Sequence, residues 1–166
     1  MKVEEQLQIA LSSHDGDRLM KAYEAIYEEY HGLIAFVISK YVANPADAEE
    51  ILNDAFLSFF NCKKKGEVRS IKYFLVVSAK NKCMDRLSRP SFDPLEIEPP
   101  FKDEYSSFLD SLKEALGEED YELLYDYIVE ESSSQELAAR RGVSSASIRM
   151  RIARIKKKVR ALFKEA

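Results

Sequence analysis

The sequence has no tryptophan, only two cysteines and no long run of apolar residues. Cys62 and Cys83 cannot build a disulfide framework, and neither belongs to a CxxC pair with histidines at metal-ligand spacing. No stretch approaches the roughly 20 apolar residues of a membrane span, and the first residues lack the apolar run of a signal peptide. We therefore expect a cytoplasmic chain without membrane insertion, with buried or inert thiols and with neither metal nor cofactor.

Catalytic signatures are also missing. The two histidines, His14 and His31, have no nucleophile or carboxylate at a spacing that suggests an active site. We interpret both as structural or surface residues and expect no enzyme.

Charge, in contrast, is abundant and uneven. The 166 residues carry a net charge of -4, yet Lys+Arg against Asp+Glu is 4 to 11 in residues 1–60, 9 to 2 in 61–90, 2 to 15 in 91–136 and 10 to 1 in 137–166. Two compact basic blocks between acidic ones are typical of a protein that touches a polyanion at two places. Solvated helix faces are the alternative.

The spacing of apolar residues predicts an all-α fold of two small helical domains. Apolar residues recur at helical intervals on both sides of a segment that holds four of the five prolines, RPSFDPLEIEPPF, and no hairpin signal is present. Prolines at this density cannot continue a helix, so the segment is a flexible linker. The predicted domains are residues 1–89 and 106–166, and the linker is residues 90–105.

In the first domain, Asn44 and Pro45 predict the N-cap and first turn of a helix that runs to about Phe60. One face is apolar and predicted to be buried, and the opposite face is polar with one leucine in it. That second face is either a docking surface or an ordinary solvated face. The buried stripe comprises Ala48, Ile51, Leu52, Ala55, Phe56 and Phe59, and the polar face comprises Asp47, Glu50, Asn53, Asp54 and Leu57.

A basic loop, residues 61–70, leads into a basic amphipathic helix over about residues 71–89. Its predicted inward residues are Phe74, Leu75, Ala79 and Leu87, whereas Tyr73 and Asn81 are expected on the surface. Cations beside an amide and an aromatic ring suit single-stranded DNA, where stacking and charge act together. The cations and the amide that we assign to this contact are Lys63, Lys64, Lys65, Arg69, Lys80, Asn81 and Arg86.

The second domain begins with a helix that ends at Gly117 and a second one that starts at the acidic run of residues 118–120. Residues 133–163 then predict a helix-turn-helix. The first helix ends at Gly142, Val143 fills the space between the helices, and Ser144 caps the second helix. Ile148, Ile152, Ile155 and Val159 define its buried side.

The opposite side of that last helix suits the major groove of DNA, because small residues let the backbone approach base edges while arginines and serines reach phosphates. A basic helix for a membrane surface or an acidic partner is less suitable, since the exposed boundary lacks large apolar residues. The residues assigned to DNA are Ser145, Ala146, Ser147, Arg149, Met150, Arg151, Arg154 and Lys157.

Together these motifs resemble the extracytoplasmic-function (ECF) group of the sigma-70 family, which has only the second and fourth conserved regions. NPADAEEILNDAFLSFF is similar to the helix that docks on the clamp of the largest polymerase subunit, and YFLVVSAKNKCMDRLSR to the promoter-melting helix. The helix-turn-helix is similar to the region that reads the minus-thirty-five element. The family's usual tryptophan is Phe74 here, and Met150 stands where many relatives have a polar or small residue.

The resemblance implies an alternative sigma factor that binds core RNA polymerase and promoter DNA and that performs no chemistry itself. Asn81 would then face an unpaired base of the minus-ten element, and the 61–70 loop would hold the displaced strand. An anti-sigma factor is a further partner that the resemblance allows. The alternatives are a helix-turn-helix regulator acting without polymerase and a sigma-like adaptor that does not open promoters.

Overall fold

The structure, a computed structural model, describes residues 1–88 and 104–164. Over these two ranges the regular elements are all helices, so the predicted all-α class is confirmed. The chain divides into two compact units, Met1–Phe101 and Lys102–Ala166. Residues 90–103 of the predicted linker lie outside the described ranges, and its last two residues already belong to a helix.

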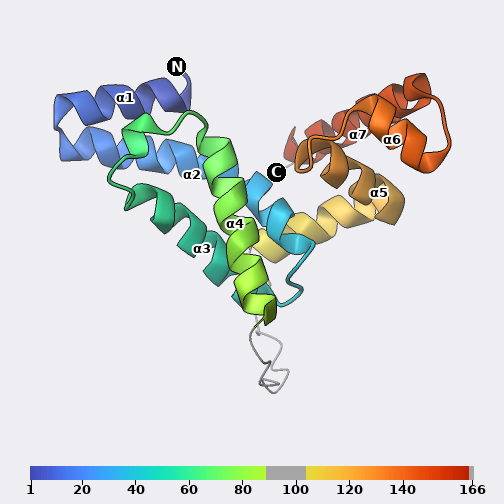
Figure 1. Ribbon diagram of the computed structural model, residues 1–166, viewed down its shortest axis with the longest axis horizontal. Helices are drawn as coiled ribbons and strands as arrows, with labels where there is room; N and C mark the ends of the chain where they lie inside the picture. Colours follow the sequence, from blue (N-terminus) through green and yellow to red (C-terminus); the bar gives the residue numbers. More distant parts are fainter. Residues whose placement is uncertain (89–103, 165–166) are drawn as a thin grey trace. The chain divides into compact units, whose positions relative to one another are not determined.

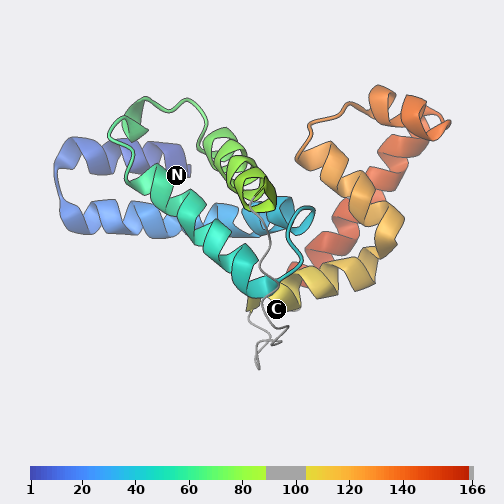
Figure 2. The ribbon, with the colours of Figure 1, turned by 60° about the horizontal axis from the view of Figure 1, so that its bottom comes forward.

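The first unit is built around one long helix. α2 (Gly16–Ser39) packs against α1 (Val3–Ser13), α3 (Pro45–Phe60) and α4 (Ile71–Ser88), and α3 also packs against α4 (Figure 1). A short 3₁₀ helix, η1 (Lys65–Glu67), interrupts the loop between α3 and α4. Figure 2 shows α1 and α2 as an antiparallel pair with α3 crossing them.

Helix α3 forms where the sequence predicts it. The Asn44 side chain accepts hydrogen bonds from the backbone N–H groups of Ala46 and Asp47, and Pro45 occupies the first turn. This cap satisfies donors that the helix itself cannot pair. All six residues of the predicted buried stripe are buried, and Phe59 is fully enclosed.

Helix α4 packs on this stripe with Leu75 and Ala79, as predicted. The ring of Phe74 meets Phe59 edge-on, with centroids 5.4 Å apart. The prediction for Leu87 is wrong, because its side chain is 58% exposed. At about 100° per residue Leu87 lies roughly 80° from the centre of the buried stripe, and it falls in the last turn of α4.

Aromatic rings fill the space where α2 meets the C-terminal end of α3. Tyr23 stacks on Phe60 with centroids 4.2 Å apart, and Tyr27 tilts against Phe56 at 4.9 Å. Such pairs contribute about 0.5–1.5 kcal/mol beyond the area they bury. They fix the position at which the chain leaves α3 and enters the basic loop.

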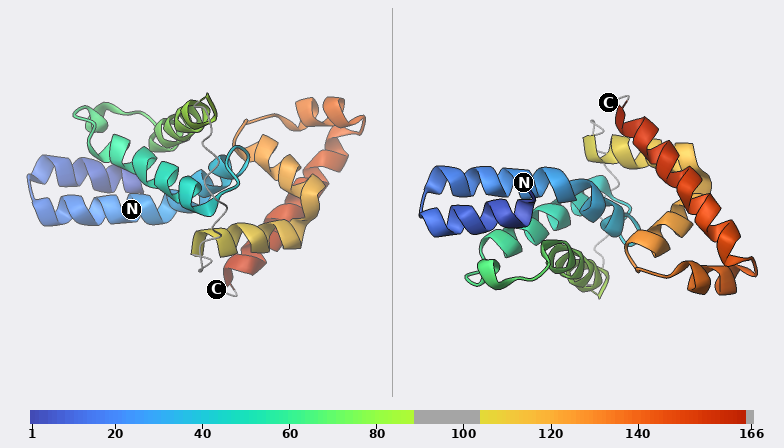
Figure 3. Two further views of the ribbon diagram at one scale, coloured as in Figure 1. Left: turned by 90° about the horizontal axis from the view of Figure 1, so that it is seen from below. Right: turned by 90° about the horizontal axis from the view of Figure 1, so that it is seen from above.

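The second unit consists of α5 (Glu104–Ile128), α6 (Ser134–Arg141) and α7 (Ser145–Lys164). Figure 3 shows α7 as the long helix against which α5 and α6 pack. α5 is broken at Gly117, whose φ of 78° is outside the helical region, and the acidic run from Glu118 starts its second half. The predicted helix end and restart are both confirmed.

The turn between α6 and α7 is tight and depends on Gly142, which has φ 67° and ψ 32°. Leu137 and Ile148 fill the space between the two helices. The prediction that Val143 fills it is wrong, since this side chain is 47% exposed. The N–H of Val143 donates to the carbonyl of Ala138 to close the turn, which directs the side chain away from the core.

Replacing Gly142 tests this turn. A Cβ at this position meets no atom within 4 Å, so Gly142→Ala changes only the backbone preference. We expect Gly142→Ala to lower the free energy of unfolding of the second unit by about 1–2 kcal/mol, because alanine disfavours a left-handed conformation. Gly142→Asn is the control and should be milder, since asparagine tolerates this region. Urea unfolding followed by NMR signals of residues 108–160 measures both, and equal losses would contradict the explanation.

Candidate interaction surfaces

The exposed side of α3 forms an acidic surface, which we define as Asp47, Glu50, Asn53, Asp54 and Leu57. Glu50, Asn53 and Asp54 are exposed, Asp47 is half-exposed, and the leucine is 52% exposed. At about 100° per residue these positions lie opposite the buried stripe. The structure therefore brings all five predicted residues onto one face, where an apolar side chain is surrounded by carboxylates.

One cation already touches this acidic surface. Arg86 of α4 forms ion pairs with Asp47 and with Glu50, the latter between Nη1 and Oε2 at 3.4 Å. Arg86 lies in the last turn of α4 on the buried side of the helix, which faces α3, and its side chain is 35% exposed. The sequence assigned Arg86 to DNA together with Asn81, but the two residues lie on different sides of the helix. The structure thus places Arg86 at the α3–α4 contact.

The solvent side of α4 carries a different chemistry. Tyr73 is 69% exposed, Asn81 is exposed, and Met84 between them around the helix is 46% exposed. Lys80 lies at the edge of this face and is half-buried. An aromatic ring, an amide and a polarizable thioether thus share one surface, and Met84 was not identified from the sequence because methionine at helical spacing is usually a core residue.

The basic loop presents its cations on both sides of η1. Lys63 and Lys64 precede it and Arg69 follows it, and all three are exposed. Lys65 is half-buried, and its Nζ lies 6.0 Å from the centre of the Tyr23 ring. Three of the four predicted loop cations are therefore directed to solvent, while Lys65 helps to hold the loop on α2.

Helix α7, which follows α6 after the turn at Gly142, presents a basic outer face. The Ser144 side chain accepts the N–H of Ser147 and caps α7, as predicted. Ile148, Ile152 and Ile155 are buried and Val159 is half-buried. Of the residues assigned to DNA on α7, six are exposed and two, Ser145 and Arg151, are half-buried. The exposed ones are Ala146, Ser147, Arg149, Met150, Arg154 and Lys157.

Arg151 is engaged within the second unit. Its Nε donates to Asp120 Oδ1 at 2.6 Å, and its Nη2 lies 3.2 Å from Glu119 Oε2. The hydrogen bond from Arg151 to Asp120 is the main cause that raises the pKa of the guanidinium above its usual value. The side chain is 33% exposed and joins α7 to the second half of α5. Arg151 therefore stabilises the unit and is not part of the open basic face.

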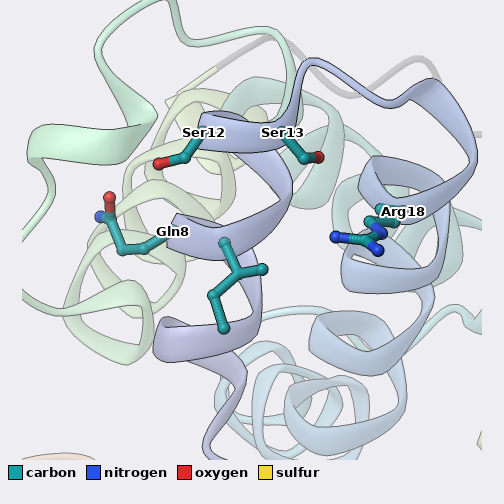
Figure 4. A pocket seen from close by; sticks show the side chains of 5 residues that line it. Gln8, Ser12, Ser13 and Arg18 are labelled. Carbon is teal, nitrogen blue, oxygen red and sulfur yellow. The ribbon is translucent and has the colours of Figure 1, made fainter.

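A buried thiol and an open pocket lie outside these surfaces. Burial raises the pKa of Cys83 to about 11, so its thiol stays protonated at neutral pH. Across residues 1–88 and 104–164, no group of three His, Cys, Asp or Glu residues could hold a metal ion. None of the helices in these two ranges combines the length and the apolar composition that a membrane span requires. An open pocket on α1 and α2 is lined by Gln8, Ile9, Ser12, Ser13 and Arg18 (Figure 4).

The different roles of two arginines on α7 can be separated by mutation. We expect Arg151→Ala to lower the free energy of unfolding of the second unit by about 1–2 kcal/mol, because it removes charge-assisted hydrogen bonds to Asp120 and Glu119. Arg154→Ala is the matched control on the exposed face and should change stability by less than about 0.5 kcal/mol. Urea unfolding measures both, and the reverse order would contradict the assignment of Arg151.

Comparison with known protein families gives a match within the first unit. Residues 26–91 match the family model for Sigma-70 region 2, a range that covers part of α2, all of α3 and η1, and α4. No match was found among curated proteins. The acidic surface of α3, the basic loop and the solvent face of α4 all fall inside the matched range. The part of the first unit that spans residues 26–91 is therefore similar to sigma-70 region 2.

Proposed function

We propose that the chain is a sigma factor of the ECF type, which binds core RNA polymerase and directs promoter recognition and transcription initiation. The single observation that carries the proposal is the match of residues 26–91 to Sigma-70 region 2. A region 2 domain supports a role in polymerase binding and promoter recognition. The surfaces of this domain are suited to those two tasks, and the helix-turn-helix is suited to a third.

Polymerase binding is assigned to the acidic surface of α3. Its carboxylates complement a basic partner and steer association, while Leu57 provides a partly exposed apolar contact at the centre. Charge at the rim mainly sets the rate and the orientation of docking, and the apolar contact adds affinity. The partner surface proposed is the clamp of the largest core subunit.

Promoter opening is assigned to α4 and the basic loop. Tyr73 presents a ring on which a base can stack, and Asn81 presents both a donor and an acceptor for the edge of an unpaired base. Lys63, Lys64 and Arg69 supply charge for the displaced strand. A base held on such a surface returns about 1–3 kcal/mol, which offsets the cost of unstacking it.

Duplex binding upstream is assigned to the exposed face of α7. Arg149 and Arg154 are placed to reach phosphates, while Ala146 and Ala153 let the backbone approach the major groove. Arg86 and Arg151 are left out of the DNA contacts in this proposal, because each is paired with carboxylates of its own unit. The proposed site of action is the cytoplasm.

Charge reversal tests the docking surface. We expect Asp54→Lys and Glu50→Lys each to weaken association with purified core polymerase by about tenfold or more, because like charges then face each other across the interface. Glu28→Lys on α2 is the matched control, an exposed acid outside the acidic surface, and should bind like the wild type. Equal affinity of all four proteins, measured by fluorescence titration at fixed salt, would refute the assignment.

Promoter opening has its own test. We expect Tyr73→Ala and Asn81→Ala to reduce the opened fraction of a promoter at saturating core polymerase, with the tyrosine change worth about 1–3 kcal/mol for one stacked base. Tyr73→Phe keeps the ring and is the control that should open normally. Permanganate reactivity of unpaired thymines reports opening.

Run-off transcription with the wild-type protein separates a sigma factor from an adaptor, since an adaptor yields no transcript.

A further inference from the structure

Helix α1 lies outside residues 26–91 and still contacts the basic loop. Its buried residues, Val3, Leu7 and Ala10, pack on α2, so the helix is anchored along one side. Tyr30 of α2 reinforces the anchor, because its hydroxyl donates to Glu4 Oε1 at 2.9 Å. Another part of the α1 surface, at Gln8 and Leu11, lies against η1.

The contact between α1 and the loop centres on Gly66. Gln8 Nε2 donates a hydrogen bond to the carbonyl oxygen of Gly66 at 2.7 Å, across 58 positions of sequence. Figure 4 shows the Gln8 side chain leaving α1 on the side of the loop. A Cβ added to Gly66 would lie 3.1 Å from Leu11 Cδ1, so the backbone of η1 lies close against the Leu11 side chain of α1. Glycine at this position permits the close approach.

The hydrogen bonds within the loop do not fasten it to the body of the unit. The N–H groups of Lys65, Glu67 and Val68 donate to carbonyls three residues earlier, which shapes a turn but leaves its orientation open. Fastening comes from Gln8 on one side and from the contact of Lys65 with the ring of Tyr23 on the other. These two contacts help to position the loop cations that precede and follow η1.

We infer that α1 is a brace for the basic loop and that Gln8 is a positioning residue for capture of the displaced DNA strand. The role of Gln8 in strand capture rests on the proposed function. The contact by which α1 holds the loop does not depend on that function. Gln8 acts through the carbonyl of Gly66 and touches no nucleic acid. Without it, Lys63, Lys64 and Arg69 keep their charges but lose a common orientation, so strand capture weakens while polymerase binding does not change.

The test compares Gln8→Ala with the wild-type full chain and with Ser12→Ala, an exposed polar change on the same helix. Removing one hydrogen bond should accelerate hydrogen exchange of the Glu67 and Val68 amides about two- to tenfold in the free protein. With saturating core polymerase, Gln8→Ala should lower the permanganate-reactive fraction of promoter by a similar factor at unchanged core affinity. Ser12→Ala should match the wild type in all three measurements.

The outcomes separate the brace from the proposed function. Exchange rates identical to those of the wild type would overturn the brace. Faster exchange with unchanged opening would overturn the positioning role of Gln8. A wild-type holoenzyme that opens no promoter would refute the proposed function and the purpose of the brace, while the exchange rates would still decide whether α1 holds the loop.

Discussion

The packing of α3 against α4 is the contact on which the surfaces of the first unit depend. Phe59 and Leu75 are fully buried there, and one face of each helix packs into this core. Burial of such side chains stabilises the unit by about 1.5–3 kcal/mol each. Because the buried faces are fixed, the opposite faces are fixed as well: carboxylates on α3, and a ring with an amide on α4. One core therefore orients both the proposed polymerase contact and the proposed DNA contact.

Two arginines show how the charge pattern is used inside the molecule. Arg86 joins α4 to α3, and Arg151 joins α7 to α5, each through two carboxylates. Both guanidinium groups are about one-third exposed, so water screens these pairs only partly and they contribute more than fully exposed ones. The basic blocks therefore offer fewer cations to a partner than their composition suggests, and those that remain are confined to defined faces.

The periodicity of the sequence predicted the helices and their buried faces well. The cap at Asn44, the stripe that ends at Phe59 and the left-handed glycine at Gly142 all follow from local chemistry, which the sequence states directly. Periodicity assigns a residue to a side of its helix but does not identify its neighbour. For that reason Leu87 and Val143 were predicted to be buried, and both are exposed.

The same limit explains what was missed at the candidate surfaces. The partners of Arg86 and Arg151 lie more than 30 positions away, and Gln8 is 58 positions from Gly66. No local pattern relates such residues, because the contacts arise only when separate helices pack. A glutamine on an exposed helix face is typical of solvent-exposed surface, and a glycine after three lysines is typical of a loop. The contact between α1 and the basic loop can be identified only from the structure.

Under the proposed function, the small size of each basic face has a consequence for specificity. The loop exposes three of its four predicted cations and α7 a single helical face, so each makes few phosphate contacts and binds DNA weakly. Two weak contacts become strong only when their separation matches the spacing of their targets, since the second contact is then made at a high effective concentration. Polymerase that holds both units would supply that fixed separation. Under this proposal, the free acidic chain binds DNA weakly, and it binds promoters tightly only when it is bound to polymerase.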